Sequence, residues 1–158
     1  MLMRYLISAL VALVPMAVGY GVWQFLAKPR AADSLWIAPT DGQARLEGKR
    51  LYDTYCASCH GISLQGQANW RQRMDNGRLP APPHDFSGHT WHHPDIQLIE
   101  MIKIGFVGGV NAPKGYQSDM PAFGSVLSDE QIRLVLGYIK SAWPDDALEA
   151  QREISLKQ

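Results

Sequence analysis

Five consecutive residues combine two thiols with an imidazole. They read Cys56-Ala57-Ser58-Cys59-His60, and the chain has no other cysteines. On a helix, residues three apart lie about one turn apart, so both sulfurs can reach the two vinyl groups of one porphyrin and form thioethers. The adjacent His60 would then face the iron from the same side, and neutral imidazole is a good iron ligand. The spacing predicts one covalently bound haem c.

Two other chemistries use the same thiol spacing. A redox-active C-x-x-C pair belongs in a β-α-β context, and this sequence shows no strand alternation of any length. A zinc site would need two further ligands. The histidines that could supply them are His84, His89, His92 and His93. One of these histidines could instead be the second protein ligand of the haem iron, in place of Met120. Together they could also bind another metal. We favour a third interpretation, in which they belong to a solvated or hydrogen-bonded loop.

An apolar segment precedes the motif. Residues 5–27 contain no charged side chain, and as a helix they would span about 35 Å, enough to cross a hydrocarbon core of roughly 30 Å. We therefore expect residues 1–30 to form an N-terminal transmembrane anchor, the alternative being a signal peptide cleaved near residues 17–19. Both alternatives carry the rest of the chain out of the cytoplasm. The positive charges after the segment, Lys28 and Arg30, outnumber Arg4 before it, so the positive-inside rule would keep the rest of the chain in the cytoplasm. We nevertheless expect export, because the thiol motif indicates covalent haem attachment.

The remaining sequence predicts short helices joined by long loops. A capping box, Ser128 to Gln131, marks the start of one helix. Helical periodicity is found in three stretches, residues 43–56, 94–104 and 128–143. The loops between them are too long for a compact domain unless something other than secondary structure organises them. A bulky apolar cofactor enclosed by the loops would supply the missing core.

The overall composition excludes two classes of protein. The formal net charge is +0, whereas nucleic-acid binders normally carry a basic excess. Two cysteines allow one disulfide at most, which excludes a disulfide scaffold.

Together these features resemble a single-haem class I c-type cytochrome. In that family the first helix crosses the last through a glycine and an aromatic residue, and Gly48, Tyr52 and Tyr138 resemble these positions. The resemblance implies an all-α cytochrome c fold of three to four short helices around one haem, preceded by the N-terminal transmembrane helix. The expected organisation is an anchor (1–30), a linker (31–42), a cytochrome c domain (43–143) and a C-terminal tail helix (144–158).

The resemblance also implies the other groups around the haem. Met120 matches the family's distal methionine, a soft thioether that raises the reduction potential relative to a second histidine. The carbonyl of Pro82 would accept a hydrogen bond from the second ring nitrogen of His60. Independently of the resemblance, we expect Trp91 to donate its indole N–H to a haem propionate, because buried indoles usually find a partner, or else to pack in the core.

Two protein ligands on the iron leave no site for a substrate, so we expect an electron-transfer protein and not an enzyme. Its place would be the inner membrane, with a single pass and the haem domain in the periplasm. There it would carry electrons between a quinol-oxidising complex and a terminal oxidase or reductase. The alternative is a haem-bearing subunit of a respiratory or periplasmic dehydrogenase or oxidase complex. We expect redox-protein partners at the membrane, no nucleic acid and no small-molecule substrate.

Basic side chains could form a docking rim around the haem edge for an acidic partner. Equally, they could be scattered solubilising charges. They are Arg45, Lys49, Arg50, Arg71, Arg73, Arg78, Lys103 and Lys114.

Overall fold

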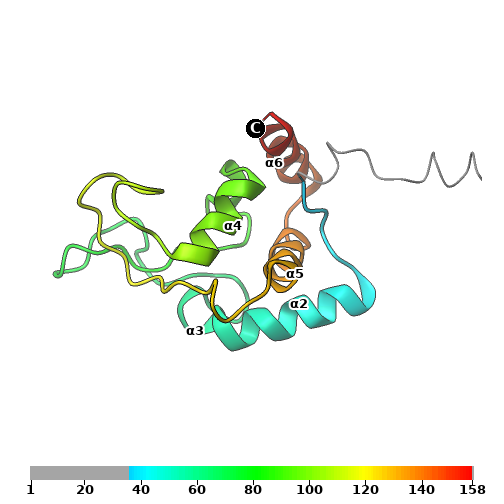
Figure 1. Cartoon of the computed structure of the whole chain (residues 1–158), viewed down its shortest axis with the longest axis horizontal. Helices are drawn as coiled ribbons and strands as arrows, with labels where there is room; N and C mark the ends of the chain where they lie inside the picture. Colours follow the sequence, from blue (N-terminus) through cyan, green and yellow to red (C-terminus); the bar gives the residue numbers. More distant parts are fainter. Residues whose placement is uncertain (1–35, 158) are drawn as a thin grey trace, which may run out of the picture. The chain divides into compact units, whose positions relative to one another are not determined.

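The computed structural model describes residues 36–157 (Figure 1). Its helices are, in chain order, α2 (Gly42–Tyr55), α3 (Ala57–His60), the 3₁₀-helix η2 (Thr90–His92), α4 (Asp95–Ile104), α5 (Asp129–Lys140) and α6 (Asp145–Leu156). The all-helical expectation is thus confirmed for this part of the chain. The anchor predicted for residues 1–30 lies outside the described residues. Within residues 36–157, no helix combines the length and the apolar character needed to cross a membrane.

The first predicted helix is divided in two at the thiol motif. Cys56 has φ −116° and ψ −36°, well away from the α-helical φ near −63°. The chain therefore leaves α2 at this residue and starts the single turn α3, which contains Cys59 and His60. This break adds one short helix to the predicted number, so residues 36–157 hold five α-helices.

A glycine allows α2 and α5 to meet. A Cβ atom on Gly48 would lie 2.3 Å from the carbonyl oxygen of Leu134, so any side chain there would push the helices apart. Beside this contact the buried rings of Tyr52 and Tyr138 lie 5.4 Å apart between centroids. Figure 1 shows α5 nearly end-on above α2, so the helices cross. The contact predicted through Gly48, Tyr52 and Tyr138 is confirmed.

The start of α5 follows the predicted capping box. The Ser128 hydroxyl accepts from the backbone N–H of Gln131, and the Gln131 side chain accepts from the N–H of Ser128. Two of the orphan donors at the helix start are thereby satisfied. One face of the helix is then buried in the core, through Ile132, Val135, Leu136 and Ile139.

A buried ion pair joins three helices to the start of the described chain. Lys140 of α5 and Asp95 of α4 are almost inaccessible to solvent, and their charged groups lie 2.7 Å apart. The Lys140 ammonium also donates to the carbonyl of Ile37 and to the side chain of Gln151 on α6, at 2.8 Å each. Trp36 donates its indole N–H to the same Gln151. Helix α6 therefore packs onto its own domain, and the ion pair fixes residues 36–37 against it.

Two long loops complete the structure. The histidine-side loop (residues 61–93) leads from α3 to α4 and contains η2. The methionine loop (residues 105–127) leads from α4 to α5 and contains an isolated bridge between Gly108 and Ala112. Each loop carries one of the predicted iron ligands or its support, so their packing determines the geometry of the site.

Candidate haem site

The two thiols lie at the junction of α2 and α3. Both are free, with Cys56 half-buried against the core and Cys59 exposed. Burial raises the pKa of the Cys56 thiol to about 11. A thiol–disulfide pair acts through a thiolate near neutral pH, so this environment disfavours the redox-pair alternative. It is compatible with two sulfurs that end as thioethers.

The imidazole of His60 is held by one hydrogen bond on its inner side. Its Nδ1 atom lies 2.8 Å from the carbonyl oxygen of Pro82. A carbonyl can only accept, so Nδ1 carries the proton and Nε2 keeps its lone pair. Burial lowers the pKa of His60, and the bond to Pro82 opposes this effect. The hydrogen bond predicted between His60 and Pro82 is confirmed, and it leaves a neutral imidazole with a free metal-binding nitrogen.

A second histidine lies flat against the first. The ring centroids of His60 and His84 are 3.9 Å apart, and the ring planes differ by 19°. Burial lowers the pKa of His84 well below its usual value, and neighbouring His60 and His89 lower it further. His84 is therefore neutral. It supports the face of His60. This role was not predicted, because the sequence indicated only a ligand or a loop residue at this position.

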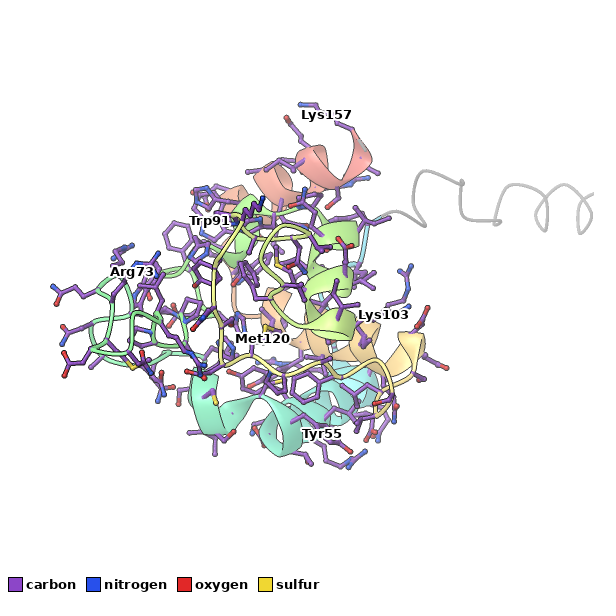
Figure 2. All side chains as sticks on the ribbon, turned by 60° about the vertical axis from the view of Figure 1, so that its left-hand side comes forward. Tyr55, Arg73, Trp91, Lys103, Met120 and Lys157 are labelled. Atoms are coloured by element: carbon purple, nitrogen blue, oxygen red, sulfur yellow. The ribbon has the colours of Figure 1, made fainter. Side chains whose placement is uncertain are left out.

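The end of α4 positions Met120. Two backbone hydrogen bonds join the methionine loop to this helix, from Phe123 N–H to the Ile102 carbonyl at 2.9 Å and from Gly124 N–H to the Lys103 carbonyl at 3.0 Å. Figure 2 shows Met120 on this loop, with Tyr55 of α2 below it and Trp91 above it in that view. The Met120 side chain is half-buried.

The end of α4 and the methionine loop approach each other closely at a second glycine. Gly105 ends α4 with φ +75°. A Cβ atom on it would lie 2.8 Å from the carbonyl oxygen of Met120. The backbone of the predicted ligand therefore rests directly on the helix end, and the position tolerates no side chain without a shift.

The indole of Trp91 carries an unused donor. Its Nε1 atom is buried and has no hydrogen-bond partner among the described residues. The ring stacks on Phe86, with centroids 5.6 Å apart, and lies tilted against His92, with centroids 3.8 Å apart. A buried N–H without an acceptor costs about 1–3 kcal/mol, and a haem propionate would supply the acceptor. Together with two thiols and a free imidazole nitrogen, this orphaned donor shows that the residues present fit a haem.

The remaining histidines do not form a metal site. His89 stacks on Trp70, with centroids 5.3 Å apart, and meets His93 edge to face. In the part of the chain that the structure describes, no group of three or more histidine, cysteine or acidic residues could hold a metal ion. The structure therefore gives no support to the zinc and second-metal alternatives.

The predicted basic rim is partly neutralised. Four of its members form ion pairs, namely Lys49 with Asp53, Arg50 with Glu47, Arg78 with Asp119 and Lys103 with Asp129. Arg45, Arg71, Arg73 and Lys114 have no ion-pair partner within residues 36–157. Figure 2 shows Arg73 and Lys103 on opposite sides of Met120 in that view. Three of these four unpaired cations, Arg71, Arg73 and Lys114, therefore lie on the two loops, and Arg73 and Lys114 line the same hollow.

Known proteins resemble this chain over the same region. The family model described as Cytochrome c matches residues 46–143. The chain is also 31% identical over 112 residues to the cbb3-type cytochrome c oxidase subunit FixP of Azorhizobium caulinodans. That match covers 69% of this chain and 34% of the relative, so the chain spans about a third of the relative's length. No solved structure matches the chain.

Proposed function

Since the chain belongs to the cytochrome c family, we propose that it transfers single electrons through one covalently bound haem c. The protein is an electron-transfer haem protein by family, and the proposal concerns how it works. The residues proposed to hold the haem are Cys56, Cys59, His60 and Met120.

The state of His60 carries this proposal. Its Nδ1–H is engaged by Pro82 at 2.8 Å, so the proton is fixed on the inner nitrogen and the outer nitrogen is free for the iron. This histidine also follows directly after two thiols, which is the order of residues that a covalently attached haem requires. The free thiols of Cys56 and Cys59 lie within the same turn of chain.

Each side chain would have a separate task. When bound, the haem supplies an iron that alternates between the ferrous and ferric states. Cys56 and Cys59 would keep it attached, while Pro82 holds His60 in one tautomer and orientation. The Met120 thioether would be the second protein ligand of the iron and would favour the reduced state. Trp91 would hydrogen-bond a propionate, which would fix the group within the domain.

We place this carrier at the periplasmic face of the inner membrane, tethered by residues 1–30. There it would link a quinol-oxidising complex to a terminal oxidase or reductase. A tether raises the effective concentration of the carrier near membrane partners. A second candidate is a haem-bearing subunit of an oxidase complex, and it is favoured by the similarity to the cbb3-type oxidase subunit.

The unpaired cations suggest where a partner docks. Arg73 and Lys114 line a hollow of about 410 Å³ between the histidine-side and methionine loops, together with Tyr116. Arg71 lies 4.1 Å from the ring centre of neighbouring Trp70. A small docking face is typical of transient redox encounters. Its positive charge would suit an acidic surface on the partner.

Expression of the full chain in a bacterial host that attaches haem c tests the proposal. We expect the reduced protein to show the absorption spectrum of low-spin haem. Its pyridine haemochrome should be characteristic of two thioether links, and the haem should stay on the chain in a denaturing gel. A folded, colourless product from the same host would contradict the proposal. Purification from membranes then separates the two candidates, since a stoichiometric complex supports the subunit and a lone monomer the carrier.

A further inference from the structure

The histidine that stacks on His60 is itself held by hydrogen bonds at its backbone and its ring. The backbone N–H of His84 donates to the Leu64 carbonyl at 2.8 Å, and its own carbonyl accepts from the Trp143 indole at 2.8 Å. Its Nδ1 atom lies 2.9 Å from the hydroxyl of Thr90. Thr90 is itself buried, with 6% of its surface exposed. The backbone of His84 and the polar edge of its ring are therefore both fixed.

The backbone of His60 is held as well, since its N–H donates to the Cys56 carbonyl and its carbonyl accepts from the Gly66 N–H. The described residues give its side chain one hydrogen bond, to Pro82. That bond fixes the position of Nδ1, yet a single bond at the edge of a ring leaves the plane free to rock about it. The flat face of His84 at 3.9 Å removes this freedom on one side. The His84 ring also forms an edge-to-face pair with Tyr52 of α2, with centroids 6.3 Å apart.

We propose that His84 is a positioning residue for His60, with Thr90 holding the His84 ring flat against it. This inference rests on the proposed function, because it takes His60 as the iron ligand. Groups beyond the direct ligands commonly set the orientation of a ligating imidazole. Here the face of the His84 ring fixes the plane of the His60 ring, and the hydroxyl of Thr90 fixes the orientation of the His84 ring.

The plane of an axial imidazole influences the energies of the iron d orbitals, and electron paramagnetic resonance of the ferric protein reports those energies as g values. The haem-loaded full chain provides this readout, which a purely structural role would not move. We expect His84→Leu to shift or broaden the largest g value, because the flat support is lost. His84→Phe keeps a flat face but loses the bond to Thr90, so its g values should lie clearly closer to those of the wild type than the g values of His84→Leu do.

Two further variants complete the set. Thr90→Val removes only the hydrogen bond to His84, so its shift should follow the direction of His84→Leu and be smaller. His89→Leu changes an exposed histidine of the same loop that lies on Trp70 and not on His60, and it should leave the g values unchanged. Haemochrome yields of all variants, measured in parallel, report whether each domain folds.

The proposal is overturned if His84→Leu keeps the wild-type g values, or if His84→Phe shifts them as much as His84→Leu does. Where His84→Leu yields no holoprotein, an unshifted Thr90→Val spectrum overturns it equally. Failure of the proposed function has a different signature, since the wild-type chain itself would then contain no covalent low-spin haem.

Discussion

The two loops that support the proposed ligands are built differently. The histidine-side loop has several buried residues, and hydrogen bonds from distant parts of the chain reach into it, such as the one from Trp143 to His84. The methionine loop is fully buried only at its two ends, Gly105 and Leu127, and its backbone bonds to other elements lie near its end, at Phe123 and Gly124. The geometry of the first ligand is therefore set by the fold, whereas that of the second depends on a few contacts with the end of α4.

This difference assigns the two sides separate roles. A carrier benefits from small rearrangement between its oxidised and reduced states, and the dense packing around His60 supplies rigidity. Met120 lies on the more exposed segment, where local opening requires less free energy. We therefore expect changes on the histidine side to affect haem attachment and folding, and changes on the methionine side to affect ligation and potential.

The largest effect is expected from the thiols. Cys56→Ala should strongly reduce the yield of covalent holoprotein, and Cys56→Ala combined with Cys59→Ala should abolish it, because both thioethers are lost. Haem staining of a denaturing gel measures the attached fraction. Ser58→Ala, an exposed change between the two thiols, is the control. Normal haem attachment in the double variant would exclude thioether formation at these cysteines.

Met120→Ala should separate ligation from attachment. The haem should stay covalently bound, while the vacated position binds added imidazole or cyanide and the reduction potential falls. Spectral titration and potentiometry measure both effects. Met74→Ala is a matched control, since Met74 is a 39% exposed methionine on the other loop. If Met120→Ala keeps the wild-type spectrum and potential, another residue is the ligand.

Lys140→Met tests a part of the domain outside both loops. It leaves the buried Asp95 carboxylate without its countercharge, so the free energy of unfolding should fall by about 3–5 kcal/mol. The haem spectrum of the folded fraction should not change. Denaturant titration measures the loss, and Lys140→Met combined with Asp95→Asn, which removes both charges, should recover part of it. A spectral change would show that the loops depend on this network.

The same lysine predicts a pH dependence. Burial lowers the pKa of Lys140 to about 8 despite the opposing effect of Asp95, from an ordinary value near 10.4. Between about pH 8 and 10 the unfolded chain therefore binds more protons at this residue, and its contribution to stability rises with pH. The stability difference between wild type and Lys140→Met should grow across this window. A constant difference would contradict the lowered pKa.

Gly105→Ala probes the support of Met120 more gently. The new Cβ would lie 2.8 Å from the Met120 carbonyl oxygen, and such overpacking costs about 1–3 kcal/mol. Gly109→Ala is a suitable control, because Gly109 also has a positive φ, +86°, but nothing within 4 Å of the added atom. Only Gly105→Ala should raise the affinity for external imidazole. Equal affinities in the two variants would mean that α4 does not position the ligand.

The features that the sequence predicted well depend on few residues. The capping box of α5 involves Ser128 and Gln131, and the α2–α5 contact requires a glycine and two aromatic residues in register. The bond from His60 to Pro82 spans 22 positions, and it was anticipated only through resemblance to the family. These features follow from local rules or from a known pattern.

The features that were missed arise from long-range packing. Lys140 and Asp95 are charged, and neither helix shows by its own periodicity that both are buried against each other. Helix α4 has apolar residues on most of its sides, so its sequence does not show which side is buried. Ile96, for example, is 60% exposed. The stacking of His84 on His60 depends on Thr90 and Trp143. No spacing in the sequence indicates it.

The smallest effect is expected where the two loops meet. Arg78 of the histidine-side loop forms an ion pair with Asp119, the residue before Met120, and both side chains are exposed. Exposed pairs contribute about 0.2–1 kcal/mol, so Arg78→Gln should raise the affinity for external imidazole by up to about fivefold. The effect should shrink in high salt, since mobile ions screen such pairs. Lys49→Gln breaks a comparable exposed pair within α2 and should leave imidazole binding unchanged. An Arg78→Gln effect that persists at high salt would indicate that Arg78 supports Met120 by packing, and the two loops would then be coupled more tightly than their ion pair suggests.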